Sequence, residues 1–327
     1  MLEIIASFIK QAIIQGIPLL YGSTGEILTE KSGNLNLGIP GIMYIGGISG
    51  VIGAYFYEKA VVDINPFLCV MIPLLCSILG SVLMALIYSF LTVTLRANQN
   101  VTGLALTTFG VGVGNFFGGS LSSLFGEGGS ISLIRTGACF KATLPFASKL
   151  GLFGDTFLSF GFLAYLAIVI ALLCSWFLNR TRAGLSLRAV GESPATADAA
   201  GINVTKYKYL ATCIGAAIAG LGGLYFIMDY IGGAWTNGGF GDRGWLAIAL
   251  VIFALWKPKY SILGSILFGG LYIVYLYIPG LSRSSQEIFK MLPYVVTIVV
   301  LIVLSIRNRR ENQPPESLGL SYFREDR

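Results

Sequence analysis

The sequence predicts an all-α protein that crosses a membrane about nine times. Of its 327 residues, 55% are hydrophobic and only 12% are charged, about half the ~25% charged residues of soluble domains. Apolar runs of about 20 residues, the length that crosses a bilayer core as a helix, recur along the chain. The 42 glycines suit helices that pack closely in lipid.

Polar or glycine-rich breaks separate the apolar runs, and we expect one helix in each run. The seventh run is short, so it and the glycine-rich loop before it could instead form a re-entrant pair. The stretch 120–156 is too polar and too glycine-rich to span. The nine predicted spans are 4–27, 37–57, 66–94, 101–119, 156–178, 209–228, 245–256, 262–278 and 291–306.

The positions of the charges predict how the chain is oriented. An odd number of spans puts the termini on opposite sides, and Lys and Arg favour the cytoplasmic side. Fourteen of the 22 Lys and Arg then share one side with the loop 180–208 and the C-terminus, and eight lie on the other. We therefore expect a transmembrane domain over 1–306, with its N-terminus outside and a cytoplasmic loop at 180–208. A polar cytoplasmic tail, which we expect to be mobile, follows over 307–327.

The composition also argues against several kinds of chemistry. The chain has no histidine, which removes the commonest general base and the commonest metal ligand. The five cysteines form no C-x-x-C pair and are interpreted as small buried apolar residues. We expect no metal site, no catalytic residues and no cofactor. The sequence contains no G-x-x-x-x-G-K-[ST] motif for nucleotide phosphates. With no basic patch interleaved with aromatic residues, nucleic acid is not an expected partner.

One short polar helix stands out between the fifth and sixth spans. Ser193 is a good N-cap, Pro194 fits the first helical position, and Gly201 can adopt the left-handed conformation that ends a helix. A helix of about two turns is marginal in water, so contacts must hold it. It is either a simple connector or a docking knob, with its alanines small enough to enter a groove.

The segment GLSLRAVGESPATADAAGINV, residues 184–204, resembles the cytoplasmic coupling loop of permease subunits of ATP-binding-cassette importers. The matching branch includes the simple-sugar, branched-chain amino acid and nucleoside permeases. Residues 28–50, 95–112 and 239–270 are also similar to this family, and the combination EKSG-NLNLG, RANQ-VTGLAL and RAVGE is closest to general nucleoside importers. The chain departs from them at Pro40, where nucleoside permeases commonly have Glu.

The resemblance implies a membrane permease that leaves ATP hydrolysis to a separate ATPase, which we expect to have two fused cassettes. It also implies a second related permease as a heterodimer partner, an extracellular substrate-binding lipoprotein, and a place in the plasma membrane of a bacterium. The short helix would dock into the ATPase. The residues that the resemblance implies for this coupling are Arg188, Gly191, Glu192, Ser193, Pro194, Ala195, Asp198, Ala199 and Gly201.

Polar residues within spans are costly in lipid and mark either function or helix packing. We interpret two groups, one near the break before the second span and one along the fourth span, as candidates to line a substrate pathway. Interhelical hydrogen bonding is the alternative for each residue. The candidates are Glu26, Asn34, Asn36, Asn98, Gln99, Asn100, Thr102, Thr107 and Thr108.

Three alternatives to a nucleoside permease stay open at this point. A simple-sugar permease would carry the same family signatures. An ion-coupled transporter or channel needs acids within the membrane, and Glu26 and Asp229 are the plausible ones. A membrane-embedded enzyme fits least, because the spans contain neither histidine nor paired carboxylates with catalytic or metal-ligand spacing.

Overall fold

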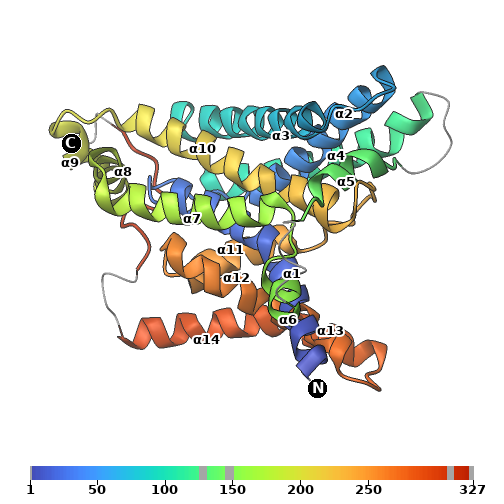
Figure 1. The fold of residues 1–327 in the computed structure, drawn as a ribbon. Coiled ribbons are helices and arrows are strands. Elements are labelled where there is room, and N and C mark those ends of the chain that lie inside the picture. The colour runs from blue at the N-terminus through green and yellow to red at the C-terminus, as the bar shows by residue number, and fades with distance from the viewer. Residues whose placement is uncertain (1, 125–130, 144–150, 308–312, 324–327) are drawn as a thin grey trace.

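The computed structural model describes residues 2–124, 131–143, 151–307 and 313–323, and it is helical throughout. Figure 1 shows the long helices lying roughly side by side, with α8 and α9 together at one end of the bundle. Within the described residues, eight helices are long and apolar enough to cross a membrane. In the same residues the only extended pairing is an isolated antiparallel bridge between Ser132 and Ala234. The predicted all-α membrane class is therefore confirmed.

The long helices follow the predicted spans to within a few residues. The fifth differs most, because Thr156 belongs to the separate helix α6 and the span itself starts at Phe162. The long helices are α1 (Leu2–Glu30), α2 (Ile39–Ala60), α3 (Pro66–Ser89), α4 (Gln99–Leu124), α7 (Phe162–Arg180), α10 (Val204–Tyr225), α12 (Pro258–Ile273) and α14 (Leu292–Arg307). The π-helical turns Phe90–Thr94 and Phe226–Tyr230 extend α3 and α10, and the 3-10 turn Val274–Tyr277 extends α12.

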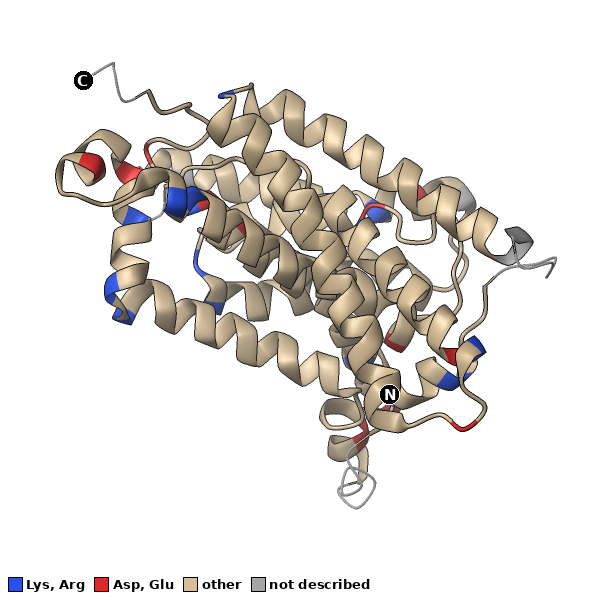
Figure 2. Cartoon of the chain, turned by 90° about the horizontal axis from the view of Figure 1, so that it is seen from above, with Lys and Arg blue, Asp and Glu red and all other residues tan. Residues whose placement is uncertain are grey.

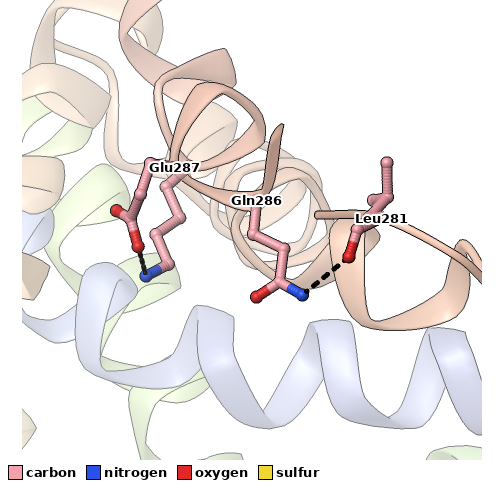
Figure 3. Close-up of polar contacts among 4 residues, drawn as sticks. Leu281, Gln286 and Glu287 are labelled. Carbon is pink, nitrogen blue, oxygen red and sulfur yellow. Dashed lines mark hydrogen bonds and ion pairs between the residues drawn. The ribbon is translucent and has the colours of Figure 1, made fainter. Parts of the chain in front are cut away.

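Six shorter helices complete the described fold: α5 (Ile134–Phe140), α6 (Gly151–Phe157), α8 (Arg182–Glu192), α9 (Pro194–Ala199), α11 (Arg243–Phe253) and α13 (Arg283–Lys290). Of these, α13 connects α12 to α14 at the end of the bundle opposite α8 and α9. A 2.7 Å ion pair between Lys290 and Glu287 and a 3.4 Å hydrogen bond from Gln286 to the Leu281 carbonyl brace its exposed surface (Figure 3).

The seventh predicted span is α11, which is too short to cross alone. Its 11 residues reach about 16 Å at 1.5 Å per residue, roughly half of a 30 Å hydrocarbon core. At its start, Arg243 donates to Gln15 in the middle of α1 at 2.9 Å, and just beyond its end Trp256 donates to Glu30, the last residue of α1. The helix therefore covers the half of the bundle nearer to Glu30.

An irregular segment, 231–242, leads from α10 to the start of α11. Its aromatic side chains Trp235 and Phe240 are buried, and both rings pack edge-on against Tyr44 of α2. Non-helical backbone at membrane depth is tolerated only where protein buries it or where it lines a cavity. The segment starts at the far end of α10, and α11 ends beside Glu30 and Lys31 at the α8–α9 end. The two together therefore cross the bundle once, as a span whose first half is irregular, and they do not form a re-entrant pair.

Helices α1, α2 and α10 form the centre of the bundle. A Cβ atom on Gly25 of α1 would lie 2.2 Å from the Gly215 carbonyl oxygen of α10, and one on Gly46 of α2 would lie 2.5 Å from the Gly220 Cα. Larger residues would force these backbones apart, so the glycines set the helix spacing. In the apolar stretch of α2, 83% of the residues are buried, whereas the share is only 28% in α3 and in α7. Helices α3 and α7 therefore lie on the outside of this chain.

Figure 2 shows Lys and Arg gathered at the end of the bundle that carries α8 and α9, and sparse along the middle of the long helices. At that end, Lys31, Arg188 and Lys257 line one cavity of about 580 Å³ together with Glu192. Burial lowers the pKa of Lys31, while the nearby Glu192 carboxylate acts in the opposite direction. This clustering is the pattern that the charge argument predicts for a single face of a membrane protein.

The expectation of a mobile tail is wrong for residues 313–323. Residues 308–312 and 324–327 lie outside the described residues, but the segment between them packs on the α8–α9 end of the bundle. Ser317 is 7% exposed and donates both its backbone N–H (3.1 Å) and its hydroxyl (2.5 Å) to the Gly191 carbonyl. Gly319 N–H donates to the Gly33 carbonyl at 3.2 Å. Its polar composition suggested a segment exposed to solvent, but hydrogen bonds from its backbone N–H groups hold it against the bundle.

Candidate functional site

Two consecutive helices, α8 and α9, form the loop between α7 and α10, and local capping explains both. The Thr181 hydroxyl accepts the Gly184 N–H at 3.0 Å and starts α8. Ser193 ends α8, and its hydroxyl accepts the Thr196 N–H at 3.4 Å to start α9 with Pro194 in its first turn. Gly201 follows at φ +81°, the left-handed conformation that suits glycine. The short helix is present where its capping residues predict it.

The two faces of α9 have different surroundings. Ala197 is buried with Val190 of α8 and Val204 of α10, and Tyr322 of the tail packs against this cluster. Ala195, Thr196 and Ala199 are exposed on the other side. Because small side chains cover the outer face and an apolar cluster holds the inner face, α9 is a fixed, narrow knob at the surface.

Gly191 and Gly33 let the loop sit directly on the break between α1 and α2. A Cβ atom on Gly191 would lie 2.3 Å from the Lys31 carbonyl oxygen, and one on Gly33 would lie 2.7 Å from the Ser317 hydroxyl. The tail fastens the same junction from outside, since Ser317 donates to the Gly191 carbonyl and Gly319 to the Gly33 carbonyl. It also binds α9, where Tyr322 donates to the Asp198 carboxylate at 2.8 Å. The knob, the break and the tail are therefore joined by direct contacts.

The break itself, residues 31–38, is a buried polar junction. Asn34 and Asn36 are fully or almost fully buried. The Asn34 side chain donates to the Thr212 hydroxyl of α10 at 3.1 Å. The Asn36 N–H donates to Glu26 of α1 at 3.0 Å, and the Asn36 side chain accepts the Gly38 N–H at 2.9 Å. The backbone groups freed by unwinding thus find partners inside the protein, whereas the Asn34 side-chain oxygen and one Glu26 oxygen have none among the described residues.

Helix α4 contributes further partners to this junction. Gln99 accepts the Leu35 N–H at 2.6 Å, and the Thr107 hydroxyl donates to the Leu37 carbonyl at 2.8 Å. The Thr102 hydroxyl donates to the carbonyl of Asn98, the residue just before the helix, at 2.8 Å. Of the nine candidate residues along both groups, six therefore have buried, internal partners: Glu26, Asn34, Asn36, Gln99, Thr102 and Thr107.

The remaining candidates, Asn98, Asn100 and Thr108, lie on the exposed surface of this chain. Asn98 caps α4 by accepting the Val101 N–H at 3.1 Å. Asn100 and Thr108 lie about 80° apart around α4, at about 100° per residue, and both are exposed. Phe109 and Phe116 are exposed on the side of the helix opposite Asn100, with Thr108 between. Polar side chains on the outside of an apolar helix are costly against lipid.

Sequence reasoning missed three features of this region. Asn115, which accepts a hydrogen bond from Tyr44, could have been found as an isolated amide within an apolar run. The second missed feature is helix α8, which the capping residue Thr181 could have signalled. The packing of the tail carries no local signal, because its partners are more than 100 positions away.

A family model described as "Branched-chain amino acid transport system / permease component" matches residues 8–301. The chain therefore belongs to this family of ATP-binding-cassette transporter permeases. It is 32% identical to the nucleoside ABC transporter permease protein NupC of Lactococcus lactis, with 90% of each chain covered. It is 28% identical to the guanosine permease protein NupQ of Bacillus subtilis, covering 91% of this chain and 92% of the relative. A putative glucose ABC transporter permease protein of Haloferax volcanii, TsgC13, is 31% identical, with 98% of each chain covered.

Proposed function

We propose that this chain is the pathway-forming permease of an ATP-driven nucleoside importer, and that α9 is its contact with a separate ATPase. Membership of the permease family supports the transport role. The names of the nucleoside and guanosine relatives support the substrate class. A simple sugar is the second candidate, because the putative glucose permease is matched over almost its whole length.

The architecture of α9 is the observation that carries the coupling proposal. Its outer face presents Ala195 and Ala199, while the capping residues Ser193 and Pro194 fix where the helix begins. Glu192, which is exposed, and Asp198 beside the tail supply charge at its two ends, and Gly201 ends it. Behind it, Gly191 and Arg188 connect the knob to the α1–α2 break and to the cavity lined by Lys31. A push on α9 would reach α1 and α10 through these contacts.

In this proposal the α8–α9 end faces the cytoplasm of a bacterium whose plasma membrane holds the chain, and the N-terminus lies outside. The transmembrane domain covers 1–306, with the coupling loop at 180–208 and the polar tail at 307–327. The partners are an ATPase with two fused cassettes, a second related permease as a heterodimer and an external substrate-binding lipoprotein. The high share of Lys and Arg at the α8–α9 end supports this orientation.

The outward polar face of α4 is our candidate for the surface that meets the second permease and lines the pathway. Asn98, Asn100 and Thr108 would offer hydrogen bonds to a ribose or a base edge. Glu26, Asn34, Asn36, Gln99, Thr102 and Thr107 would act behind this face by holding the α1–α2 break in shape. Their internal hydrogen bonds support this division of roles.

Replacing Ala199 with Glu tests the coupling role of α9. Ala199 is exposed, so the chain should fold and insert. Burying an unpaired carboxylate in an ATPase groove is costly, so we expect uptake of radiolabelled nucleoside by the reconstituted importer to be lost. Co-purification of the ATPase should fall as well. Ala199→Ser and Ala183→Glu, the latter at an exposed position of α8, are the matched controls. Full uptake by an assembled Ala199→Glu complex would show that α9 is only a connector.

Competition assays separate the two substrate classes. Uptake of adenosine by the intact importer should be reduced by excess guanosine or uridine and unaffected by glucose or ribose. The reverse pattern would assign a sugar permease while leaving the coupling role of α9 unchanged.

A further inference from the structure

A second cavity, of about 460 Å³, opens beside α9 on the side away from the Lys31 cavity. Three elements enclose it: the turn after α3, the turn from α9 into α10, and the tail. Its polar lining comes mainly from Thr92, Arg96, Asp198, Thr205, Lys208 and Tyr322. Asp198 is also one of the proposed coupling residues, whereas the other five belong neither to the proposed substrate pathway nor to the outer face of α9. The function proposed above gives the cavity itself no ligand.

Lys208 is the unusual member of this lining. Only 3% of it is exposed, and its carbonyl accepts the Thr212 hydroxyl at 2.9 Å, but its ammonium makes no hydrogen bond or ion pair within the described part of the chain. The other buried charged residues in that part all have partners: Arg243 has Gln15 and the Phe240 carbonyl, Glu26 has the Asn36 N–H, and Glu30 has the Trp256 N–H. Because an enclosed ammonium without a partner is costly, Lys208 favours the binding of an anion in this cavity.

The other groups of the cavity favour the same charge. The Arg96 guanidinium lies 4.5 Å from the centre of the Phe323 ring, a contact that positions its charge without neutralising it. Val204 and Thr205 belong to the first turn of α10, a 22-residue helix. The Asn203 side chain accepts the Lys206 N–H at 2.9 Å, whereas the Val204 and Thr205 N–H groups have no partner inside the helix. Asp198 is the one acid in the lining, and the Tyr322 hydroxyl already donates to its carboxylate at 2.8 Å.

We propose that this cavity binds a phosphate group, with Lys208 as its buried cation, Arg96 as its outer cation and the first turn of α10 as a source of N–H donors. Its position at the start of a membrane helix gives it access to two sources of phosphate. One is the headgroup of an anionic phospholipid, and the other is free phosphate or a nucleoside monophosphate from the aqueous side. The binding itself does not depend on the proposed function.

Binding at this place would also act on α9, a consequence that rests on the proposed coupling role. Asp198 and Tyr322, which hold α9 to the tail, form one wall of the cavity, and Lys208 and Arg96 form the opposite side with α10 and the end of α3. An anion between these walls would tie the knob to two long helices. Occupancy would therefore tune how firmly α9 is held when the ATPase moves.

The experiment uses the purified full-length chain in a neutral detergent and follows its thermal unfolding midpoint. The aqueous probes are inorganic phosphate and adenosine monophosphate, each compared with chloride at equal ionic strength. The lipid probe is phosphatidylglycerol, compared with phosphatidylcholine in mixed micelles. The variants are Lys208→Met, which keeps the length of the side chain, and Arg96→Gln. Lys206→Met, an exposed lysine one half-turn away that is not part of the lining, is the matched control.

We expect at least one probe to raise the unfolding midpoint of the parent chain and of Lys206→Met. Lys208→Met should abolish this shift, and Arg96→Gln should weaken the affinity by about tenfold or more, as for the loss of a charge-assisted hydrogen bond. Without any probe, Lys208→Met should be at least as stable as the parent, because it removes an uncompensated charge. This second readout separates loss of a ligand site from loss of the fold.

The response to each probe identifies the source of the phosphate. A shift with phosphatidylglycerol alone assigns a lipid headgroup, and a shift with phosphate or adenosine monophosphate assigns a soluble ligand. Equal shifts in the parent and in Lys208→Met would overturn the proposal. A second result would also overturn it. In that result no probe shifts the midpoint, and Lys208 is protected from an amine-reactive label only when the ATPase is present. The anion would then be a carboxylate of that subunit. Failure of the Ala199→Glu experiment would leave the phosphate result unaffected.

Discussion

The α1–α2 break and the outward face of α4 contain the same kinds of side chain in opposite settings. At the break, Asn34 and Asn36 are enclosed and every hydrogen bond they make stays within the chain. On α4, Asn100 and Thr108 lie at the surface of an otherwise apolar helix. An amide in a membrane span is costly in both settings. The direction in which its side chain points decides whether it holds the fold together or is available to a partner or a substrate.

The physical reason lies in the backbone. Where α1 ends and α2 has not begun, the unpaired N–H and C=O groups must find partners inside the protein. Glu26, Gln99 and Thr107 supply them. Helix α4 is regular and satisfies its own backbone, so the side chains on its outer face have no such task. The two regions should therefore respond to mutation in different ways.

The largest effect is expected at the break, for Glu26→Leu. The substitution leaves the buried Asn36 N–H without its 3.0 Å acceptor, and an unsatisfied buried group costs roughly 1–3 kcal/mol. We expect a lower unfolding midpoint and poor recovery of the folded chain from membranes. Glu26→Gln, which keeps an acceptor oxygen, is the control. Normal stability of Glu26→Leu together with lost uptake would instead assign Glu26 to the substrate pathway.

A smaller and different effect is expected on α4. Asn100→Leu and Thr108→Val change exposed positions, so the chain should fold and assemble normally. If these side chains bond the substrate, each loss should cost roughly 0.5–1.5 kcal/mol of transport free energy, a decrease of about two- to tenfold in uptake. Phe109→Leu, on another side of the same helix, should leave uptake unchanged. Equal uptake by all three variants would remove α4 from the pathway.

The sequence predicted the features that depend on neighbours in the chain. Ser193, Pro194 and Gly201 define α9 by local capping, and hydrophobic length defines the long helices. The sequence could not tell that α11 is a half-length helix held by Gln15 and Glu30, because those contacts cross more than 200 positions. Nor could it tell which polar residues of the spans face inward. Direction depends on packing between helices, and Asn34 and Asn100 look alike until α10 covers one of them.

The smallest effect is expected in the tail, where Tyr322 has an internal hydrogen-bond partner but lies near the surface. Tyr322→Phe removes the hydroxyl that donates to Asp198 at 2.8 Å and keeps the ring that packs against the Ala197 cluster. A partly exposed hydrogen bond to a carboxylate contributes about 0.5–1.5 kcal/mol, so α9 should remain folded but be held less firmly. We expect faster amide hydrogen exchange in α9 and in residues 313–323, with a decrease in uptake of only a few fold.

Leu320→Ala, which changes an exposed side chain of the same segment, should alter neither measurement. If Tyr322→Phe lowers uptake as severely as Ala199→Glu, the tail is part of the ATPase contact itself and does more than support α9.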